Sequence, residues 1–213
     1  MKTILLISGG WEGHGPEKIV QFIAERLKGS DFQATIETSL ACLEDLEKLK
    51  AYDVIFPCWT MGTLSPLQSA NLIEAVRSGV GLAGIHGGMG DAFRGNLDYE
   101  WMVGGHFVGH PYVGGYTVRL RDFTHPVTSG LPGHFAYTSE QYYLLVDPAV
   151  HVLADSEYAH EGHTVTMPVA WVKNWGRGRV FYSALGHDVA EFTTFPDSLE
   201  LLLRGIRWTA NIS

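Results

Sequence analysis

The sequence feature that most constrains the fold is an alternation of short apolar runs with amphipathic segments through the first 86 residues. Four runs have the length of strands, the first and the last with the composition of buried strands, and the three segments between them have helical periodicity. We predict strands at residues 3–8, 33–38, 53–58 and 80–85, and helices that open at Pro16, span residues 42–50 and run from Ser65 to Arg77. Strands that alternate with helices in this way form a parallel sheet with right-handed crossovers. The sequence therefore predicts a three-layer, doubly wound α/β fold with flavodoxin-like strand order.

The second half of the chain has a different pattern. Residues 98–111 are aromatic, glycine-rich and histidine-bearing, which predicts a segment that covers the sheet. Within it, His106 and His110 have helical spacing, but Gly109 and Pro111 favour a loop at residues 106–110. Shorter strands, several of them alternating and none separated by helices, are predicted at residues 116–120, 137–142, 150–153, 168–172 and 179–184. Some of these must extend the sheet in antiparallel sense. A last helix is predicted from a capping arrangement at Asp197 to about Ala210, and because no linker interrupts the chain we expect residues 1–213 to form one domain.

Composition argues against several kinds of partner. The formal net charge is −8 and the 15 Lys and Arg residues are dispersed, so we expect no nucleic-acid partner and no anionic membrane surface. Cys42 and Cys58 are too few for a disulfide framework, which fits a reducing cytoplasm. With no signal-peptide pattern and no apolar run near membrane-spanning length, a cytoplasmic location is predicted. The aromatic, poorly helical second half leads us to expect an exposed apolar face and a homodimer.

Histidines follow several of the predicted strands. His86 ends the run that begins at Val80 and stands among glycines, His14 follows the first strand, and His187 follows the strand at residues 179–184. Because ligands bind at the carboxyl edge of an open parallel sheet, we expect these loops to converge there. We assign His86 and His187 as the catalytic acid and base, and expect the substrate to be bound by six further residues, namely His14, Trp59, Glu100, His106, His110 and Glu140.

The same residues allow other interpretations. His86, His106, His110 and His187 could instead supply nitrogen ligands to a divalent metal such as zinc, with an open position for water. A single histidine in a loop is more often a hydrogen-bonding residue with no chemical role. The sequence leaves the cofactor open, because acid–base chemistry on a sugar needs no metal.

Four blocks of the sequence resemble the ThuA-like family, which is named for trehalose utilisation in bacteria. They are Gly84-Ile85-His86, the run from Tyr99 to Pro111, His125-Pro126-Val127, and the run from Gly178 to His187. The resemblance implies a fold of the class I glutamine amidotransferase-like superfamily, with a sharp strand-to-helix turn that carries cysteine in the amidotransferases. His86 matches that position, so no glutaminase activity is expected.

The resemblance also implies a place in disaccharide breakdown. The family is linked to sugars that a partner dehydrogenase has oxidised to a 3-keto form. We therefore expect a small-molecule sugar ligand and an enzyme, for example a 3-keto-glycoside hydrolase or isomerase. The alternatives are a non-catalytic sugar-binding or sensing domain and an accessory subunit with an amidotransferase-like fold.

Overall fold

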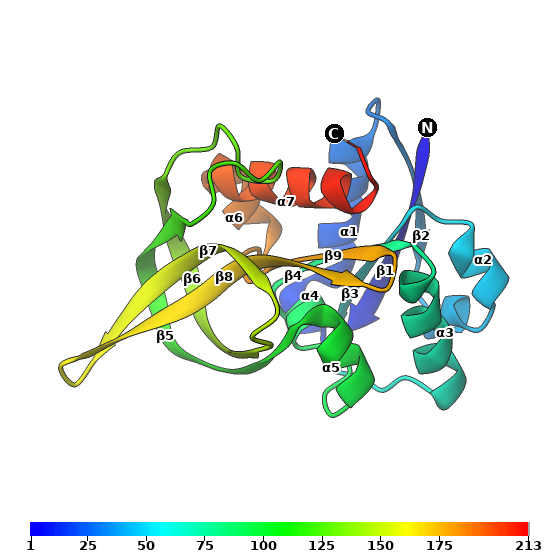
Figure 1. The fold of residues 1–213 in the computed structure, drawn as a ribbon, viewed down its shortest axis with the longest axis horizontal. Helices are drawn as coiled ribbons and strands as arrows, with labels where there is room; N and C mark the ends of the chain where they lie inside the picture. Colours follow the sequence, from blue (N-terminus) through cyan, green and yellow to red (C-terminus); the bar gives the residue numbers. More distant parts are fainter. Residues whose placement is uncertain (213) are drawn as a thin grey trace.

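The computed structural model describes residues 1–212, and its strands form one nine-stranded sheet with helices on both faces (Figure 1). The strands are β1 (Lys2–Gly10), β2 (Phe32–Glu37), β3 (Val54–Thr60), β4 (Gly81–Ile85), β5 (Gly105–Leu120), β6 (His134–Val146), β7 (His151–His160), β8 (His163–Trp175) and β9 (Gly178–Ser183). The α-helices are α1 (Pro16–Leu27), α2 (Leu46–Lys50), α3 (Pro66–Arg77), α4 (His86–Gly90), α5 (Leu97–Val103), α6 (Val189–Thr194) and α7 (Pro196–Thr209). Two short 3-10 helices are η1 (Glu12–His14) and η2 (Leu40–Leu43).

The parallel half of the sheet has the predicted flavodoxin-like order. Strands β2, β1, β3, β4 and β9 lie side by side in that order, and each neighbouring pair is parallel. Alternate side chains of β1 enter different layers: Ile4 and Leu6 pack in the core with α1, α6 and α7, while Leu5 and Ile7 pack with α2, α3 and α5. Each face of the sheet is therefore covered by helices, and the three-layer α/β class is confirmed.

The antiparallel half is more extensive than the sequence predicts. Beyond β9 the sheet continues through β8, β7, β5 and β6, all antiparallel to their neighbours. The expectation of a loop at residues 106–110 is wrong, because this stretch belongs to β5, which follows α5. Gly109 and Pro111 are tolerated there since the β5–β6 register shifts on either side of Gly109, and a bulge accepts residues that a regular ladder would not.

Three helix predictions have different outcomes. The capping box at Ser65 is confirmed: its side chain accepts from the Gln68 amide, and the Gln68 side chain accepts from the Ser65 amide. The single helix predicted at residues 42–50 is wrong, because Asp45 caps a separate α2 by accepting from Lys48 N at 3.0 Å. The last helix begins at Pro196, without the predicted side-chain cap.

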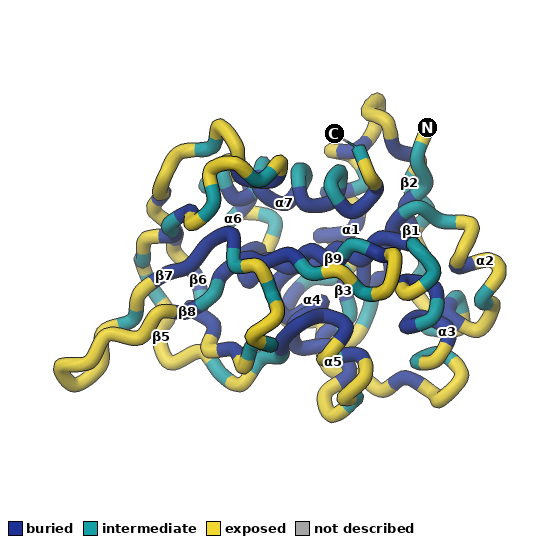
Figure 2. The backbone as a smooth tube through the Cα atoms, viewed as in Figure 1, coloured by how far each residue is buried: buried dark blue, intermediate teal, exposed yellow. Residues whose placement is uncertain are grey.

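Strands β1, β3, β4 and β9 are buried over most of their length, whereas the edge strand β2 is partly exposed and the tip of the β7–β8 hairpin is exposed (Figure 2). Within residues 1–212, no helix combines the length and the apolar character needed to cross a membrane.

Candidate functional site

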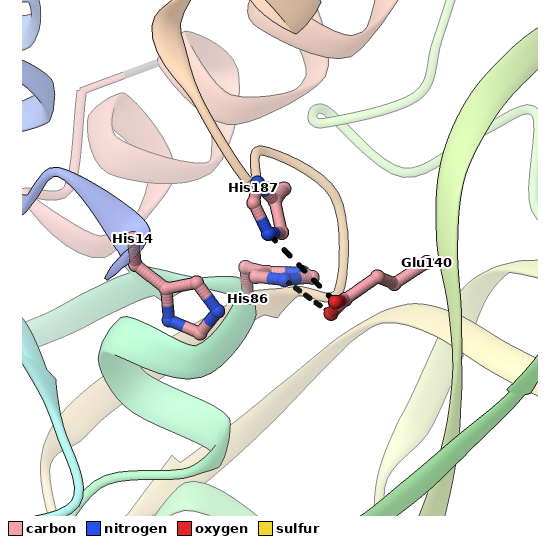
Figure 3. A group of neighbouring side chains, drawn as sticks. All are labelled: His14, His86, Glu140 and His187. Atoms are coloured by element: carbon pink, nitrogen blue, oxygen red, sulfur yellow. Dashed lines mark ion pairs between the residues drawn. The ribbon is translucent and has the colours of Figure 1, made fainter. Parts of the chain in front are cut away.

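Three histidines and one glutamate meet at the carboxyl edge of the parallel strands (Figure 3). His14 ends η1 after β1, His86 follows β4 directly as the first residue of α4, and His187 lies between β9 and α6. Glu140 comes from β6 in the antiparallel half. One ligand atom from each of the four side chains lies within 4.8 Å of the other three. We refer to these four residues as the His₃Glu cluster.

His86 occupies a strained turn and has one ring nitrogen fixed in its role. Its φ is 39°, in the left-handed region that a side chain disfavours. Its Nδ1 lies 2.8 Å from the carbonyl oxygen of Ala184, and since a carbonyl only accepts, Nδ1 carries a proton and donates. Nε2 is buried, lies 3.3 Å from Glu140 Oε2, and has no partner in hydrogen-bond geometry. The ring nitrogen of His86 that lacks a hydrogen-bond partner, Nε2, therefore faces a carboxylate.

His14 is held as a neutral imidazole. Its Nδ1 lies 2.8 Å from Thr60 Oγ1, and its ring centroid is 4.9 Å from that of His86 and 5.0 Å from that of His187. Burial, reinforced by those two neighbouring rings, lowers the pKa of His14 to about 3. Gly87 makes this position available, because a Cβ at Gly87 would lie 2.4 Å from His14 Cε1.

Glu140 is the negative centre of the cluster. Its Oε1 lies 3.7 Å from Nε2 of His187 and 3.7 Å from Nε2 of His110. Its polar contact with His86 lowers the pKa of Glu140 to about 2, with burial opposing and the charges of the other rings assisting. Glu140 is therefore a carboxylate at neutral pH, and at least three imidazole nitrogens face it.

Aromatic rings surround the cluster. Tyr142 stacks on His86 with centroids 4.0 Å apart, and Phe107 lies 4.4 Å from Tyr142. Trp11 meets His14 edge-on at 4.7 Å and is half exposed. These rings give the site an apolar rim next to its polar centre.

Three residues that support the cluster were missed from the sequence. Thr60 contacts His14, and Tyr182 donates from its hydroxyl to the His86 carbonyl at 3.1 Å. Glu191 accepts from the His187 amide at 2.9 Å. The pattern Asp188-x-x-Glu191 is a helix-start signal that would have found α6, and Asp188 does cap it, but Thr60 and Tyr182 give no local signal.

The remaining predicted site residues lie outside the four-residue cluster. His106 pairs with Glu100 at 3.2 Å, so these two contact each other. His110 reaches Glu140 from the exposed side. The indole of Trp59 packs over Gly9 and Gly62, where it fills space against the backbone. The set of converging ligand atoms thus differs from the predicted metal set: His14 and Glu140 take the places of His106 and His110.

The turn after β4 carries the imidazole of His86 and no thiol. Cys58 is buried in β3, and burial raises the pKa of its thiol to about 12. Burial raises the pKa of the Cys42 thiol to about 11. Neither sulfur is at the turn, and neither is a thiolate at neutral pH.

The strand order, the strained turn after β4 and the polar cluster at the sheet edge define an α/β protein with a class I glutamine amidotransferase-like fold. The sequence model of the ThuA family, described as trehalose utilisation, matches residues 3–209, and the chain belongs to this family. A comparison with curated protein sequences gives no match.

Solved structures show the same fold. A ThuA-like protein from Bacteroides uniformis superposes with a TM-score of 0.80 at 22% identity, over 98% of this chain and 91% of its own. A second, from Parabacteroides merdae, gives 0.77 at 20% identity over 99% and 90%. A β-galactosidase from Bacillus circulans gives 0.64 at 16% identity, with all of this chain covering 31% of that enzyme. At these identities the likeness shows the fold alone.

Proposed function

We propose that this protein is an enzyme of carbohydrate utilisation that converts a keto-sugar or keto-glycoside at the His₃Glu cluster. The description of the family as trehalose utilisation supports the substrate class. The chemistry is proposed from the geometry of the cluster.

The observation that carries the proposal is the buried Nε2 of His86, which faces Glu140 without a hydrogen-bond partner. A buried polar atom without a partner costs about 1–3 kcal/mol, and a left-handed φ at a non-glycine residue adds to this cost. A histidine retained only for loop structure would be expected to satisfy both ring nitrogens. The arrangement is what a site needs if this nitrogen is to meet a proton, a cation or a substrate atom.

The surroundings suit a sugar. Glu140 and His187 are 20% and 28% exposed, so the cluster is open to solvent on their side. Trp11 is available as a stacking platform for the apolar face of a pyranose ring, and Phe107 packs against Tyr142, which stacks on His86.

A keto-sugar is activated by positive charge beside its carbonyl oxygen. A base then removes the proton from the adjacent carbon, the C–H electron pair forms the C=C bond of an enolate, and the carbonyl π electrons move to oxygen. Reprotonation completes an isomerisation, and the same polarisation assists hydrolysis. In a metal-free site, His86 and His187 would serve as acid and base. A divalent metal ion held by these rings would instead supply the charge that polarises the carbonyl.

The test is turnover of 3-keto-trehalose followed by carbon NMR, with trehalose as the unoxidised control. We expect the wild-type protein to consume the keto-sugar and to leave trehalose unchanged. Glu140→Gln keeps the size of the side chain and removes its charge, and should lower turnover about 10²–10⁴-fold. Glu74→Gln, on the exposed face of α3, is the matched control and should be as active as the wild type.

Binding of the keto-sugar without any turnover would favour the non-catalytic sugar-binding alternative. Equal activity of a folded Glu140→Gln protein would refute the placement of the site.

A further inference from the structure

We infer that the His₃Glu cluster is a binding site for one divalent transition-metal ion such as Zn²⁺, held by His14, His86, His187 and Glu140. The inference deepens the proposed function, because it supplies the positive charge that polarises the substrate carbonyl, and it rests on that function only for the role of the ion.

The spacing of the four side chains fits one ion. Ligand atoms about 2.0–2.1 Å from a common ion lie about 3.3–3.4 Å from one another in a tetrahedral arrangement. Nε2 of His86 is 3.3 Å from one oxygen of Glu140, and Nε2 of His187 is 3.7 Å from the other. All four ligand atoms lie within 4.8 Å of one another, so shifts of about 1 Å or less would complete the shell. Figure 3 shows the carboxylate of Glu140 next to the rings of His86 and His187, with the ring of His14 on the other side of His86 in this view.

Hydrogen bonds at Nδ1 orient the rings of His86 and His14 so that Nε2 of each can bind a metal ion. A metal-binding histidine commonly donates its other N–H to a carbonyl or similar acceptor, which fixes the tautomer and the ring orientation. His86 does this with the carbonyl of Ala184, and the Nδ1 of His14 meets the hydroxyl of Thr60. In each case Nε2 is then the atom left to bind.

The charges within the cluster also favour a bound cation. Three imidazole rings with centroids 4.9–5.2 Å apart cannot all be protonated without strong mutual repulsion. A single cation satisfies all three lone pairs and the carboxylate together. It also gives a partner to the buried Nε2 of His86.

The donor set selects the class of metal. Imidazole nitrogen suits zinc, iron, nickel and copper, whereas Mg²⁺ and Ca²⁺ prefer shells made of oxygen. Three nitrogens and one carboxylate therefore favour a transition metal. His187 and Glu140 are the exposed members of the set, so an additional position on that side is open to a substrate oxygen.

The experiment measures metal binding apart from turnover. The full-length protein is stripped with a chelator and titrated with Zn²⁺ by calorimetry, and Co²⁺ loading is followed by its visible absorption. Mg²⁺ is the negative control. We expect one Zn²⁺ per chain, a Co²⁺ spectrum with nitrogen ligands, and no measurable Mg²⁺ binding.

Variants locate the site. His187→Gln and Glu140→Gln, both partly exposed, should keep the fold by circular dichroism and weaken Zn²⁺ binding by at least 100-fold. His106→Gln alters a histidine of the metal set expected from the sequence that lies outside the cluster, and should bind Zn²⁺ like the wild type. His151→Gln, which is exposed and paired with Asp122, is a second control.

The outcomes separate the two proposals. No Zn²⁺ or Co²⁺ binding by the wild type, or equal binding by His187→Gln and Glu140→Gln, overturns the metal site even if 3-keto-trehalose is consumed. Stoichiometric binding that is lost in those variants supports it even if no keto-sugar is consumed, a result that would refute the proposed function alone.

Discussion

Replacing Gly87 with alanine tests whether the position of His14 depends on close packing against α4. A Cβ at Gly87 would lie 2.4 Å from Cε1 and 2.6 Å from Nδ1 of His14, where ordinary contacts begin at 3.4 Å. The imidazole must therefore move by about 1 Å from its present position, in which it contacts Thr60 and belongs to the cluster.

Two effects on stability oppose each other in this variant. Alanine in place of glycine within a helix gains about 0.5–1 kcal/mol. The displaced ring costs about 0.5–1.5 kcal/mol in rotamer strain, and the buried hydrogen bond to Thr60 costs about 1–3 kcal/mol if it is left unmade. Packing outweighs helix propensity, and we expect a net loss of about 1–3 kcal/mol.

The assay is thermal unfolding followed by circular dichroism, together with Zn²⁺ titration. For a domain of this size the loss lowers the Tm by about 2–12 °C. The shift of one ligand should weaken Zn²⁺ binding about tenfold or more. Gly109→Ala is the control, because no atom lies within 4 Å of its Cβ position, and its Tm should stay close to that of the wild type. A Gly87→Ala protein that is as stable as the wild type and binds Zn²⁺ equally well would refute the packing argument.

Three further predictions concern a helix cap, a supporting hydroxyl and the effect of acid. Ser65→Ala removes the capping box of α3 and should lower the free energy of unfolding by about 1 kcal/mol in a urea titration; an unchanged midpoint would show that the cap is dispensable. Thr60→Val removes the hydroxyl beside His14 Nδ1 and should weaken Zn²⁺ binding about 10–100-fold by calorimetry, whereas equal affinity would show that the hydroxyl does not orient the ring. The pKa of His14 is about 3 in the folded protein and 6.5 in the unfolded chain, so acid favours unfolding of the metal-free protein. This one group should lower its stability by about 2 kcal/mol between pH 6.5 and pH 5, and His14→Asn should show a smaller loss.

The parallel half of the fold could be predicted because its signals are local. Three of the four strands in residues 3–85 are short apolar runs, and Pro16 and Ser65 mark helix starts by their own chemistry. The limits of the strands in the antiparallel half could not be predicted in this way. Its strands include glycine, proline and exposed polar residues that pairing across the sheet accommodates, as at Gly109 and Pro111 in β5.

The site residues of the parallel half could also be predicted from the sequence, whereas the position of Glu140 in the antiparallel half could not. His14, His86 and His187 follow strands β1, β4 and β9, so the direction of parallel strands predicts that they meet. Glu140 was predicted as a substrate-binding residue and not as part of the metal set, because its place beside His86 depends on how the antiparallel strands pair. The register of β5 against β6 is a long-range property, and it also decides that His106 pairs with Glu100 outside the cluster.

The most direct test of the account is a crystal structure of the Zn²⁺-loaded protein with anomalous data collected on both sides of the zinc absorption edge. We expect one anomalous peak per chain, about 2.0–2.2 Å from a nitrogen of His14, of His86 and of His187 and from an oxygen of Glu140. No peak at a saturating zinc concentration, or a peak coordinated by His106 and His110 in place of His14 and Glu140, would contradict it.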